Sequence, residues 1–400
     1  MSAHALTSHP QRRLRVAVVA CETSGDALGA GLIEALRRER PDLQAFGMAG
    51  PRMREAGCEA WHGIEEVSVM GLVEVLPHLR RLLRLRAGIA ARIVAAHADV
   101  FVGIDSPDFN LPVARRVKAA GIPAVQYVSP QVWAWRQSRV THIRDAVDRI
   151  LCVLPFEKQF FADHGVDADF VGHPLADEVG FDNDSAAARA RIGADPDRPL
   201  VAVLPGSRAS EVGRLAEPFL GTARFLQEAD SALQFAIAVA NDKVRGIVEA
   251  VLARTELREQ PMLLQGQARD VLTAADVALT ASGTATLEAL LLGRRMIVAH
   301  RIAPLTWWLV RRLGVARLPN FSLPNLLAGR RIVPEFVQGR VVPEVLGPAV
   351  LDVLHGRLID PDWHAEFTRI HAQLRCNASQ AAAASVLDLV HQTSGEQRPS

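Results

Sequence analysis

The sequence has little of what defines several protein classes. Only one tyrosine and four cysteines occur among its 400 residues. The cysteines, Cys21, Cys58, Cys152 and Cys376, are far apart and form no C-x-x-C pair, so we expect neither a zinc site nor a disulfide framework. Three of them are next to apolar residues, which favours buried free thiols and a reducing, cytosolic compartment.

Neither sign of charge dominates the chain, and it has no long hydrophobic run. The 45 lysines and arginines against 44 aspartates and glutamates give a net charge of +1. That balance argues against a dedicated nucleic-acid-binding protein, which usually has a basic surplus. No uninterrupted apolar run reaches the ~18 residues of a membrane span. The polar segment Met1–Arg13 also lacks the apolar core of a secretory signal.

What the sequence does contain is an alternation of short apolar, β-branched runs with helical stretches. Near-continuous apolar strands separated by helices predict an α/β fold with parallel sheets covered on both faces. The expected strands are Leu14–Ala20, Val100–Ile104, Ile122–Val128 and Arg149–Leu154, then Leu200–Leu204, Phe235–Ala240, Met262–Gln265, Val277–Thr280 and Met296–Ala299.

A polar, Asp- and Ala-rich stretch over 180–198 separates the two series of strands and predicts a linker. We therefore expect two Rossmann-like domains, 12–180 and 198–368, facing a central cleft. C-terminal helices follow, and the segment 369–393 is expected to pack back on the first domain or to swap into the partner chain of a homodimer. Ligands of open α/β folds bind at the carboxyl ends of the strands, so the loops after strands hold the candidate site.

Three such loops of the first half carry candidate residues. Cys21–Asp26 follows the first strand and matches no dinucleotide or P-loop motif; Ser24 or Asp26 can instead cap the next helix. Asp105 ends a later strand, where a general base would meet a cleft, although a helix cap is the alternative. Trp133 suits the apolar face of a sugar, with packing in the core as the alternative.

Two turns of the second half resemble sites for a diphosphate. Leu204–Arg208 combines a Gly-Ser turn with an arginine, whose guanidinium binds phosphate in a bidentate way. Thr280–Glu288 contains a Ser-Gly-Thr turn that opens a helix, so that free N–H groups and the helix dipole can face an anion. Glu288 can accept from ribose hydroxyls or be a solvated helix residue. The candidate ligands are Gly206, Ser207, Arg208, Ser282, Gly283, Thr284 and Glu288.

No metal and no cofactor are expected. Asp-x-Asp triplets can hold a divalent ion with a nucleotide sugar, but the four in this chain fall in linkers or turns and are interpreted as caps and loops. The histidines lack the spacing of metal ligands. The triplets are Asp167–Asp169, Asp182–Asp184, Asp195–Asp197 and Asp360–Asp362.

Two segments are basic and apolar together. Leu79–Arg86 and Pro304–Leu313 combine Leu and Trp with several arginines. On a helix such residues can lie on an anionic bilayer surface. The alternatives are an ordinary helix with solvated arginines, or a dimer interface.

A series of short motifs follows in order along the chain. They are ETSGD (22–26), AGPRM (49–53), VMGLVEVL (69–76), VGIDSPDFN (102–110), YVSPQVWAWR (127–136), LPFEK (154–158), FVGHP (170–174), LPGSR (204–208), ASGTATLE (281–288), SLPNLLAGR (322–330) and RCNAS (375–379). This series resembles one family, the lipid-A-disaccharide synthases, which are nucleotide-sugar transferases of the two-domain GT-B architecture. The likeness runs from about Val16 to Val390. Cys21 departs from the pattern, which has a small glycine there.

The resemblance implies a reaction and roles for residues in it. The family joins UDP-2,3-diacylglucosamine to 2,3-diacylglucosamine 1-phosphate with inversion, giving the β(1→6) lipid A disaccharide 1-phosphate and UDP. Asp105 matches the candidate base, and Arg208 and the Ser282–Thr284 amides match the groups that stabilise UDP. Glu288 and Asn325 match donor-binding positions. Glu22, Ser24, Asp26 and Trp133 complete the expected substrate-binding set.

The family also implies a place in the cell and leaves alternatives open. Its amphiphilic substrates imply peripheral attachment to the cytoplasmic face of the inner membrane. Another UDP-sugar enzyme of two domains, such as a peptidoglycan glycosyltransferase or a UDP-GlcNAc epimerase, is the alternative enzyme. A catalytically silent nucleotide-sugar-binding protein is the alternative of another class.

Overall fold

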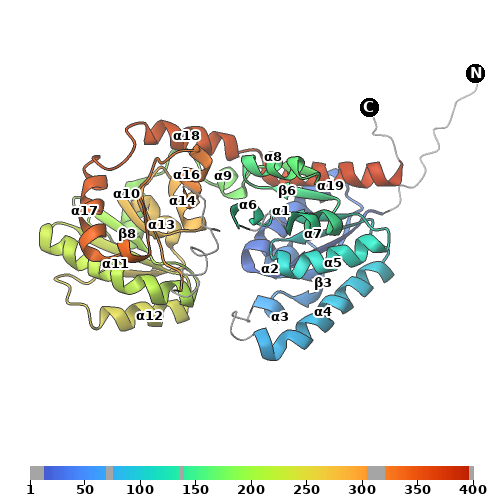
Figure 1. Ribbon diagram of the computed structural model, residues 1–400, viewed down its shortest axis with the longest axis horizontal. Coiled ribbons are helices and arrows are strands. Elements are labelled where there is room, and N and C mark those ends of the chain that lie inside the picture. The colour runs from blue at the N-terminus through green and yellow to red at the C-terminus, as the bar shows by residue number, and fades with distance from the viewer. Residues whose placement is uncertain (1–12, 69–74, 136–138, 304–319, 396–400) are drawn as a thin grey trace, which may run out of the picture. The chain divides into compact units, whose positions relative to one another are not determined.

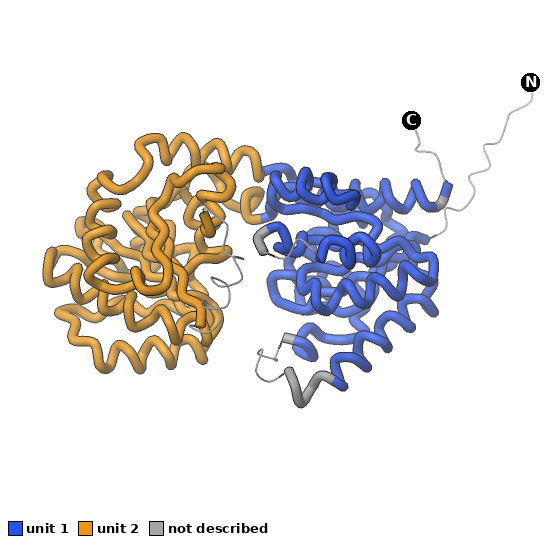
Figure 2. Tube along the Cα trace, in the orientation of Figure 1, with its two compact units in different colours: residues 1–174, 375–400 blue, residues 175–374 orange. Residues whose placement is uncertain are grey.

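The computed structural model describes residues 13–68, 75–135, 139–303 and 320–395 (Figure 1). The segment Pro304–Leu313 and most of the VMGLVEVL motif lie outside these ranges. By its contacts the chain divides into two compact units (Figure 2). Unit 1 comprises residues 1–174 and 375–400, and unit 2 comprises residues 175–374.

Unit 1 is built on a seven-stranded parallel sheet of order β3-β2-β1-β4-β5-β6-β7 (Figure 1). The strand order reverses between β1 and β4, which makes their carboxyl ends the topological switch point where ligands of this fold class bind. The strands are β1 (Arg15–Ala20), β2 (Gln44–Ala49), β3 (Glu59–Gly63), β4 (Val100–Ile104), β5 (Ala124–Tyr127), β6 (Arg149–Cys152) and β7 (Ala168–Phe170).

Helices cover the sheet of unit 1 on both faces, and alternate residues of a strand point to opposite faces. Ala17 and Val19 of β1 share one buried cluster with Ile93 and Val113 of two covering helices. The helices are α1 (Thr23–Glu39), α2 (Pro51–Glu55), α3 (Glu65–Ser68), α4 (Val75–Ala95), α5 (Pro107–Ala119), α6 (Val132–Trp135), α7 (Val140–Ala146), α8 (Pro155–Asp163) and α19 (Ala378–Ser394).

Unit 2 repeats the plan with a six-stranded parallel sheet of order β10-β9-β8-β11-β12-β13. Its order reverses between β8 and β11, whose carboxyl ends carry the Gly-Ser-Arg and Ser-Gly-Thr turns. The expected pair of parallel α/β sheets is confirmed. The strands are β8 (Leu200–Leu204), β9 (Gln234–Val239), β10 (Met262–Gln265), β11 (Val277–Ala281), β12 (Arg295–His300) and β13 (Glu335–Val337).

The helices of unit 2 bury its central strands completely. Val201 and Val203 of β8 share a buried cluster with Phe219, Val248 and Val350 of three helices. The helices are α9 (Pro174–Glu178), α10 (Ser185–Ile192), α11 (Ala209–Ala229), α12 (Asp242–Leu252), α13 (Ala268–Ala274), α14 (Thr284–Leu291), α16 (Leu323–Ala328), α17 (Pro343–Leu354), α18 (Trp363–Leu374) and the 3₁₀ turn η2 (Gln338–Arg340).

The last two helices of the chain belong to different units. α18 is the last helix of unit 2, whereas α19 packs on α1 in unit 1. A buried arginine of β6 fastens α19: Arg149 donates to the carbonyl of Ser385 at 2.9 Å and pairs with Asp388 at 3.1 Å. Among the described residues, no helix is both long and apolar enough to cross a bilayer.

Candidate functional site

The carboxyl ends of three neighbouring strands in unit 1 bring the predicted loops together. Ala20 at the end of β1 pairs with Ile104 of β4, which in turn pairs with Tyr127 of β5. The residues that follow these strand ends therefore lie side by side. This places the candidate base Asp105 beside the loop that contains Cys21 and Glu22.

Asp105 is half-buried at this switch point and does not cap the helix that follows. The N-cap of α5 is Ser106, whose side chain makes no capping hydrogen bond. The Asp105 Oδ1 atom accepts the backbone N–H of Ser106 at 2.8 Å. Within the described residues no hydrogen bond reaches its Oδ2 atom, so this oxygen is available to a ligand.

Cys21, the departure from the family pattern, lies against the candidate base. Its buried thiol hydrogen-bonds to the side chain of Ser106. Burial raises the pKa of Cys21 to about 12, and the charges of Glu22 and Asp105 add to the rise. The thiol is therefore neutral near pH 7 and fills space beside Asp105 rather than acting as a nucleophile.

The three polar residues predicted as ligands at the start of α1 differ in their exposure to solvent. Glu22 and Ser24 are exposed, as ligand-binding residues must be. Asp26 is 1% exposed, and its carboxylate accepts the N–H groups of Gly50 at 2.8 Å and Met53 at 3.1 Å. Asp26 thus caps the N-terminus of α2, and we assign it a positioning role in place of a substrate contact.

Trp133 is half-buried on α6 and is held by a buried carboxylate. Its indole Nε1–H donates to Glu157 Oε1 at 3.1 Å, and its ring packs edge-on against Phe156. Burial raises the pKa of Glu157 to about 7, although hydrogen bonds from the Leu154 N–H and the Trp133 indole oppose the rise. The sequence reasoning missed Glu157, although it lies in the LPFEK motif.

In unit 2, the turn after β8 is already filled by a carboxylate of its own chain. The Glu211 carboxylate lies against Gly206, and burial raises the pKa of Glu211, although the positive charge of Arg208 opposes the rise. Gly206 has φ = +117°, and a Cβ there would collide with the Glu211 carboxylate. A carboxylate thus already lies at the turn expected to hold diphosphate, while the exposed Arg208 guanidinium has no ion pair within 4 Å among the described residues.

The turn after β11 keeps part of the expected anion site. The N–H of Ser282 donates to the carbonyl of Ala299 at 3.0 Å, so this amide is not available. Gly283 and Thr284 are exposed at the N-terminus of α14, and no acceptor for their N–H groups lies within the described part of the chain. These two amides and the helix dipole remain to bind an anion.

Glu288 lies one turn into α14 with its side chain 18% exposed. Arg269 at the start of α13 pairs with it at 3.3 Å and also with Glu178 at 3.1 Å. This ion pair fixes the direction of the Glu288 carboxylate and leaves one of its oxygens for a ligand hydroxyl.

Asn325 is fully buried, and its amide is saturated by hydrogen bonds within unit 2. The Nδ2 atom donates to Val333 and Glu335, and the Oδ1 atom accepts the N–H groups of Ile332 and Val333. The expectation of a donor contact therefore becomes a positioning role. A buried asparagine can make at most four such bonds, and all four are formed here.

Glu335, which sequence reasoning missed, is the centre of this buried network. Its carboxylate accepts the backbone N–H of Ser322 at 2.8 Å as well as the Asn325 amide. The carbonyl of Phe321 in turn accepts the hydroxyl of Ser282 at 3.3 Å. Asn325 and Glu335 thus brace the turn that carries Gly283 and Thr284.

A family model described as lipid-A-disaccharide synthetase matches residues 16–386. The chain belongs to this family. A lipid-A-disaccharide synthase of Alkalilimnicola ehrlichii is 48% identical over 376 residues, which cover 94% of this chain and 98% of that protein. The family match thus includes both units.

Solved structures share the fold at lower identity. Arabidopsis thaliana UGT89C1 complexed with UDP superimposes with a TM-score of 0.62 at 15% identity, covering 95% of this chain and 99% of that one. The UDP-GlcNAc 2-epimerase of Neisseria meningitidis bound to UDP-GlcNAc gives 0.59 at 10% identity, covering 94% and 99%. At such identities the likeness shows the GT-B fold alone.

The Asp-x-Asp triplets of this family member have structural roles. Asp184 caps α10 by accepting the N–H of Ala187 at 2.8 Å, and Asp195 accepts the N–H of Asp197 at 2.9 Å. Asp167 pairs with Arg149. Among the described residues, no group of three or more His, Cys, Asp or Glu side chains could hold a metal ion.

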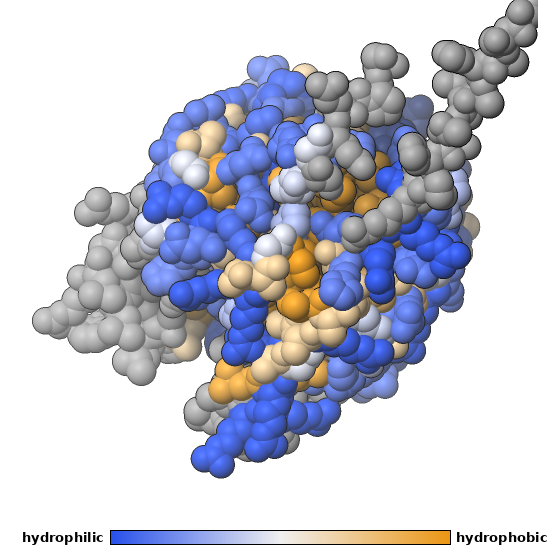
Figure 3. All heavy atoms as spheres, turned by 90° about the vertical axis from the view of Figure 1, so that its right-hand side faces the viewer, coloured by the Kyte–Doolittle hydropathy of each residue, from blue (hydrophilic) through white to orange (hydrophobic). Residues whose placement is uncertain are grey.

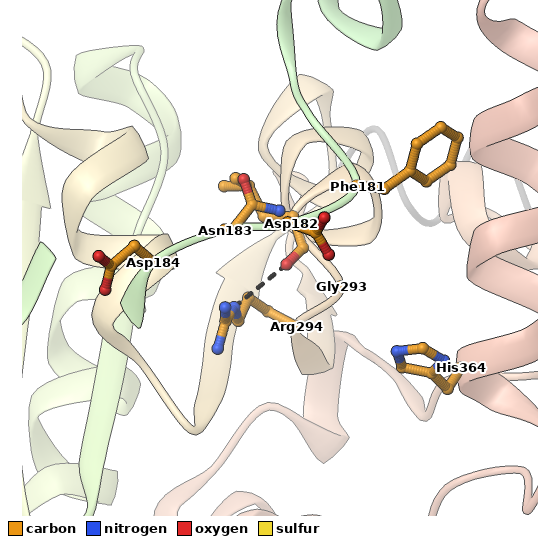
Figure 4. Close-up of a pocket in the computed structure, with 8 residues that line it drawn as sticks. Phe181, Asp182, Asn183, Asp184, Gly293, Arg294 and His364 are labelled. Atoms are coloured by element: carbon orange, nitrogen blue, oxygen red, sulfur yellow. Dashed lines mark hydrogen bonds between the residues drawn. The ribbon is translucent and has the colours of Figure 1, made fainter. Parts of the chain in front are cut away.

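One pocket of the described residues lies away from these strand ends. It has a volume of about 540 Å³ and is formed where the loop before α10 meets the turn between α14 and β12 (Figure 4). Arg294 points back into its own turn and donates to the carbonyl of Leu292 at 3.2 Å. Its lining residues, Phe181–Asp184, Leu292–Arg294 and His364, include none of the predicted site residues.

The basic, apolar segment of α4 is only partly directed outward. Leu83 is 49% exposed beside the exposed Arg80, Arg81 and Arg84. Arg86 instead turns inward, where it donates to the carbonyl of Asp108 at 3.2 Å. Figure 3 shows a face of the molecule on which a band of apolar residues is flanked by hydrophilic ones.

Proposed function

We propose that this chain joins UDP-2,3-diacylglucosamine to the 6-hydroxyl of 2,3-diacylglucosamine 1-phosphate and releases UDP. The observation that carries the proposal is the family match over residues 16–386, which includes both sets of candidate residues. The polar strand ends of unit 1 and the cationic, amide-rich turns of unit 2 support it. The structures of the same fold would equally suit other UDP-sugar enzymes, so the fold alone does not carry the proposal.

Asp105 is the proposed base. An α-linked donor and a β-linked product require inversion, so the acceptor oxygen attacks C1 from the face opposite UDP. As the new C1–O6 bond forms, Asp105 Oδ2 takes the proton of the 6-hydroxyl. The electron pair of the breaking C1–O bond goes to the diphosphate of UDP.

Unit 2 provides groups to receive the charge that develops on UDP. The Arg208 guanidinium is exposed and free of ion pairs among the described residues, so it can bind the diphosphate in a bidentate way. The N–H groups of Gly283 and Thr284 add the positive end of the α14 dipole. Glu288, oriented by Arg269, accepts a ribose hydroxyl. These groups neutralise the diphosphate charge in place of a divalent cation, so the proposed reaction needs no metal ion.

Unit 1 provides contacts for the sugar. The half-buried Trp133 ring offers an apolar face, and Glu22 and Ser24 offer exposed acceptors and donors at the start of α1. The acyl chains require an apolar surface, and the acceptor phosphate requires cations. Leu83 with Arg80, Arg81 and Arg84 meets both needs, which supports peripheral attachment to the cytoplasmic face of the inner membrane.

The proposed function is tested by incubating the purified protein with both diacyl sugars, measuring UDP release and determining the mass of the product. We expect UDP release only when both substrates are present, with a disaccharide 1-phosphate as product. Incubation with UDP-GlcNAc alone is the control for epimerisation. No UDP release with both lipids, or an epimer from UDP-GlcNAc, would overturn the proposal.

A further inference from the structure

Two fully buried amide side chains donate hydrogen bonds to the backbone carbonyl of Asp105. Asn110 of α5 donates its Nδ2–H to this oxygen at 2.9 Å, and Gln126 of β5 donates its Nε2–H at 3.0 Å. Both side chains are 0% exposed, so water does not compete for these hydrogen bonds. The amide oxygens, Asn110 Oδ1 and Gln126 Oε1, are buried with no hydrogen-bond partner among the described residues, which costs free energy. Only the N–H groups of these two side chains make hydrogen bonds, and they make them to the backbone around Asp105.

The backbone that they hold is strained. Asp105 has φ = +50° and Ser106 has φ = +41°, both in the left-handed region. Val128, after the neighbouring strand, has φ = +69°, which is rare for a β-branched residue. Residues other than glycine are sterically disfavoured in this region, so other interactions must hold the conformation.

The amides supply those interactions at several carbonyls. Asn110 also donates to the carbonyl of Ile104 at 3.0 Å, and Gln126 also reaches the carbonyls of Tyr127 and Val128, both at 3.3 Å. Each of the strained positions thus has a side-chain amide on its own carbonyl or on that of the residue before it.

β4, the strand that Asp105 follows, leaves space for this pair of amides at Gly103. A Cβ built on Gly103 of β4 would lie 2.8 Å from the Cβ of Asn110 and 3.3 Å from the Oε1 of Gln126. Any larger residue at 103 would push both amides away from the Asp105 carbonyl. The VGIDSPDFN motif therefore contains three residues that act together: Gly103, the strained Asp105 and Asn110.

We propose that Asn110 and Gln126 are positioning residues that aim the Asp105 carboxylate at the acceptor hydroxyl. The inference rests on the proposed function, in which Asp105 is the base. Fixing the carbonyl fixes the backbone dihedrals of Asp105 and with them the direction of its Cα–Cβ bond. Without the amides the backbone relaxes toward the common α or β regions, and the carboxylate points elsewhere. A misplacement of about 1 Å can lower a rate by about 100-fold.

The test compares two buried glutamines. Gln126→Met removes the amide at Asp105 with little change in length. Gln227→Met is the matched control, because Gln227 is 3% exposed in unit 2 and donates to the carbonyl of Glu259 at 2.9 Å. We expect Q126M to lower kcat by at least about tenfold, with the acceptor KM and the UDP Kd changed less than about twofold. Q227M should lose thermal stability without loss of kcat. Equal kcat values for the two variants would overturn the proposal.

A rescue experiment separates a backbone effect from general damage. Glycine adopts a left-handed conformation without steric cost, so Ser106→Gly should make the turn less dependent on Gln126. We expect the double variant Q126M/S106G to recover part of the kcat lost by Q126M, relative to S106G alone. No recovery contradicts the mechanism. If Q126M does not fold, Gly103→Ala replaces it, and an unchanged kcat in folded G103A overturns the proposal.

Asp105→Asn, measured alongside, distinguishes the two possible failures. Near-normal turnover of D105N removes Asp105 as the base, and the proposed mechanism fails. Loss of turnover in D105N together with normal turnover in Q126M leaves the base in place and overturns only the role of the amides.

Discussion

At the scale of single residues, long-range contacts decide which predicted residues can touch a ligand. The positions of Asp105 and Arg208 after parallel strands could be predicted from the sequence, and that they contact a ligand there stays a prediction. Asp26 and Asn325 could not be assigned to positioning roles, since their partners are 24 or more residues away or lie on another element. The buried Glu157 likewise becomes notable only once Trp133 is seen to donate to it.

Glu157 makes the stability of the protein depend on pH. Its pKa is raised to about 7 in the folded protein, chiefly by burial, from 4.5. Between these values the folded state retains a proton that the unfolded state has lost, so stability falls as pH rises. The expected loss is about 3 kcal/mol between pH 4.5 and pH 7.

Glu157→Gln should abolish this part of the pH dependence, because glutamine stays neutral and its carbonyl still accepts from Trp133. We would measure urea unfolding at pH 5 and pH 8 by tryptophan fluorescence. Glu34→Gln, at an exposed position of α1, is the control and should unfold with the wild-type pH dependence. An E157Q variant that loses as much stability as the wild type on going to pH 8 contradicts the prediction.

Glu211 should weaken donor binding by its charge. Its carboxylate lies against Gly206 of the Gly206–Arg208 turn, where its charge would repel an incoming diphosphate. Glu211→Gln keeps the size and polarity of the side chain and removes the charge. We expect the Kd of UDP, measured by calorimetry at pH 8, to fall by about threefold to tenfold, or about 1 kcal/mol.

Glu217 offers a control on the same helix, because its side chain is exposed on α11. E217Q should leave the affinity for UDP unchanged. Weaker binding of UDP by E211Q would show that the charge itself shapes the turn, contrary to the prediction.

At the scale of elements, strands with continuous apolar sequences could be predicted and others could not. β4, β8 and β10 have the predicted bounds: β4 and β8 are buried throughout, and the partly exposed edge strand β10 is still apolar in three of its four residues. β3 is half-exposed, and β13 has three residues that form a strand only because β12 pairs with them. α5 begins at Pro107, soon after the end of β4, because proline is favoured at the first position of a helix.

The attachment of α19 to unit 1 should depend on one buried arginine. Arg149 holds Ser385 and Asp388 of α19 together with Asp167. Arg149→Met removes these bonds and leaves the partners unpaired, at an expected cost of about 3 kcal/mol. Hydrogen exchange should then speed up over 378–394.

Arg115→Met is the control, because Arg115 is exposed on α5. It should leave exchange of α19 unchanged. Equal protection of α19 in R149M and in the wild type would mean that apolar packing on α1 holds the helix by itself.

At the scale of the whole molecule, the proposed chemistry divides between the two units, so two single substitutions should separate turnover from donor affinity. Asp105→Asn in unit 1 removes the base and should lower turnover by about 10²–10⁴-fold while the Kd of UDP stays within about twofold. Arg208→Ala in unit 2 removes the exposed guanidinium and should raise the Kd of UDP by at least tenfold, the worth of about 1.4 kcal/mol. Arg224→Ala, at an exposed position farther along α11, whose N-cap is Arg208, is the control for affinity. If D105N lost affinity for UDP as strongly as R208A, the aspartate would belong to the donor site, and the assignment of the base to unit 1 would have to be given up.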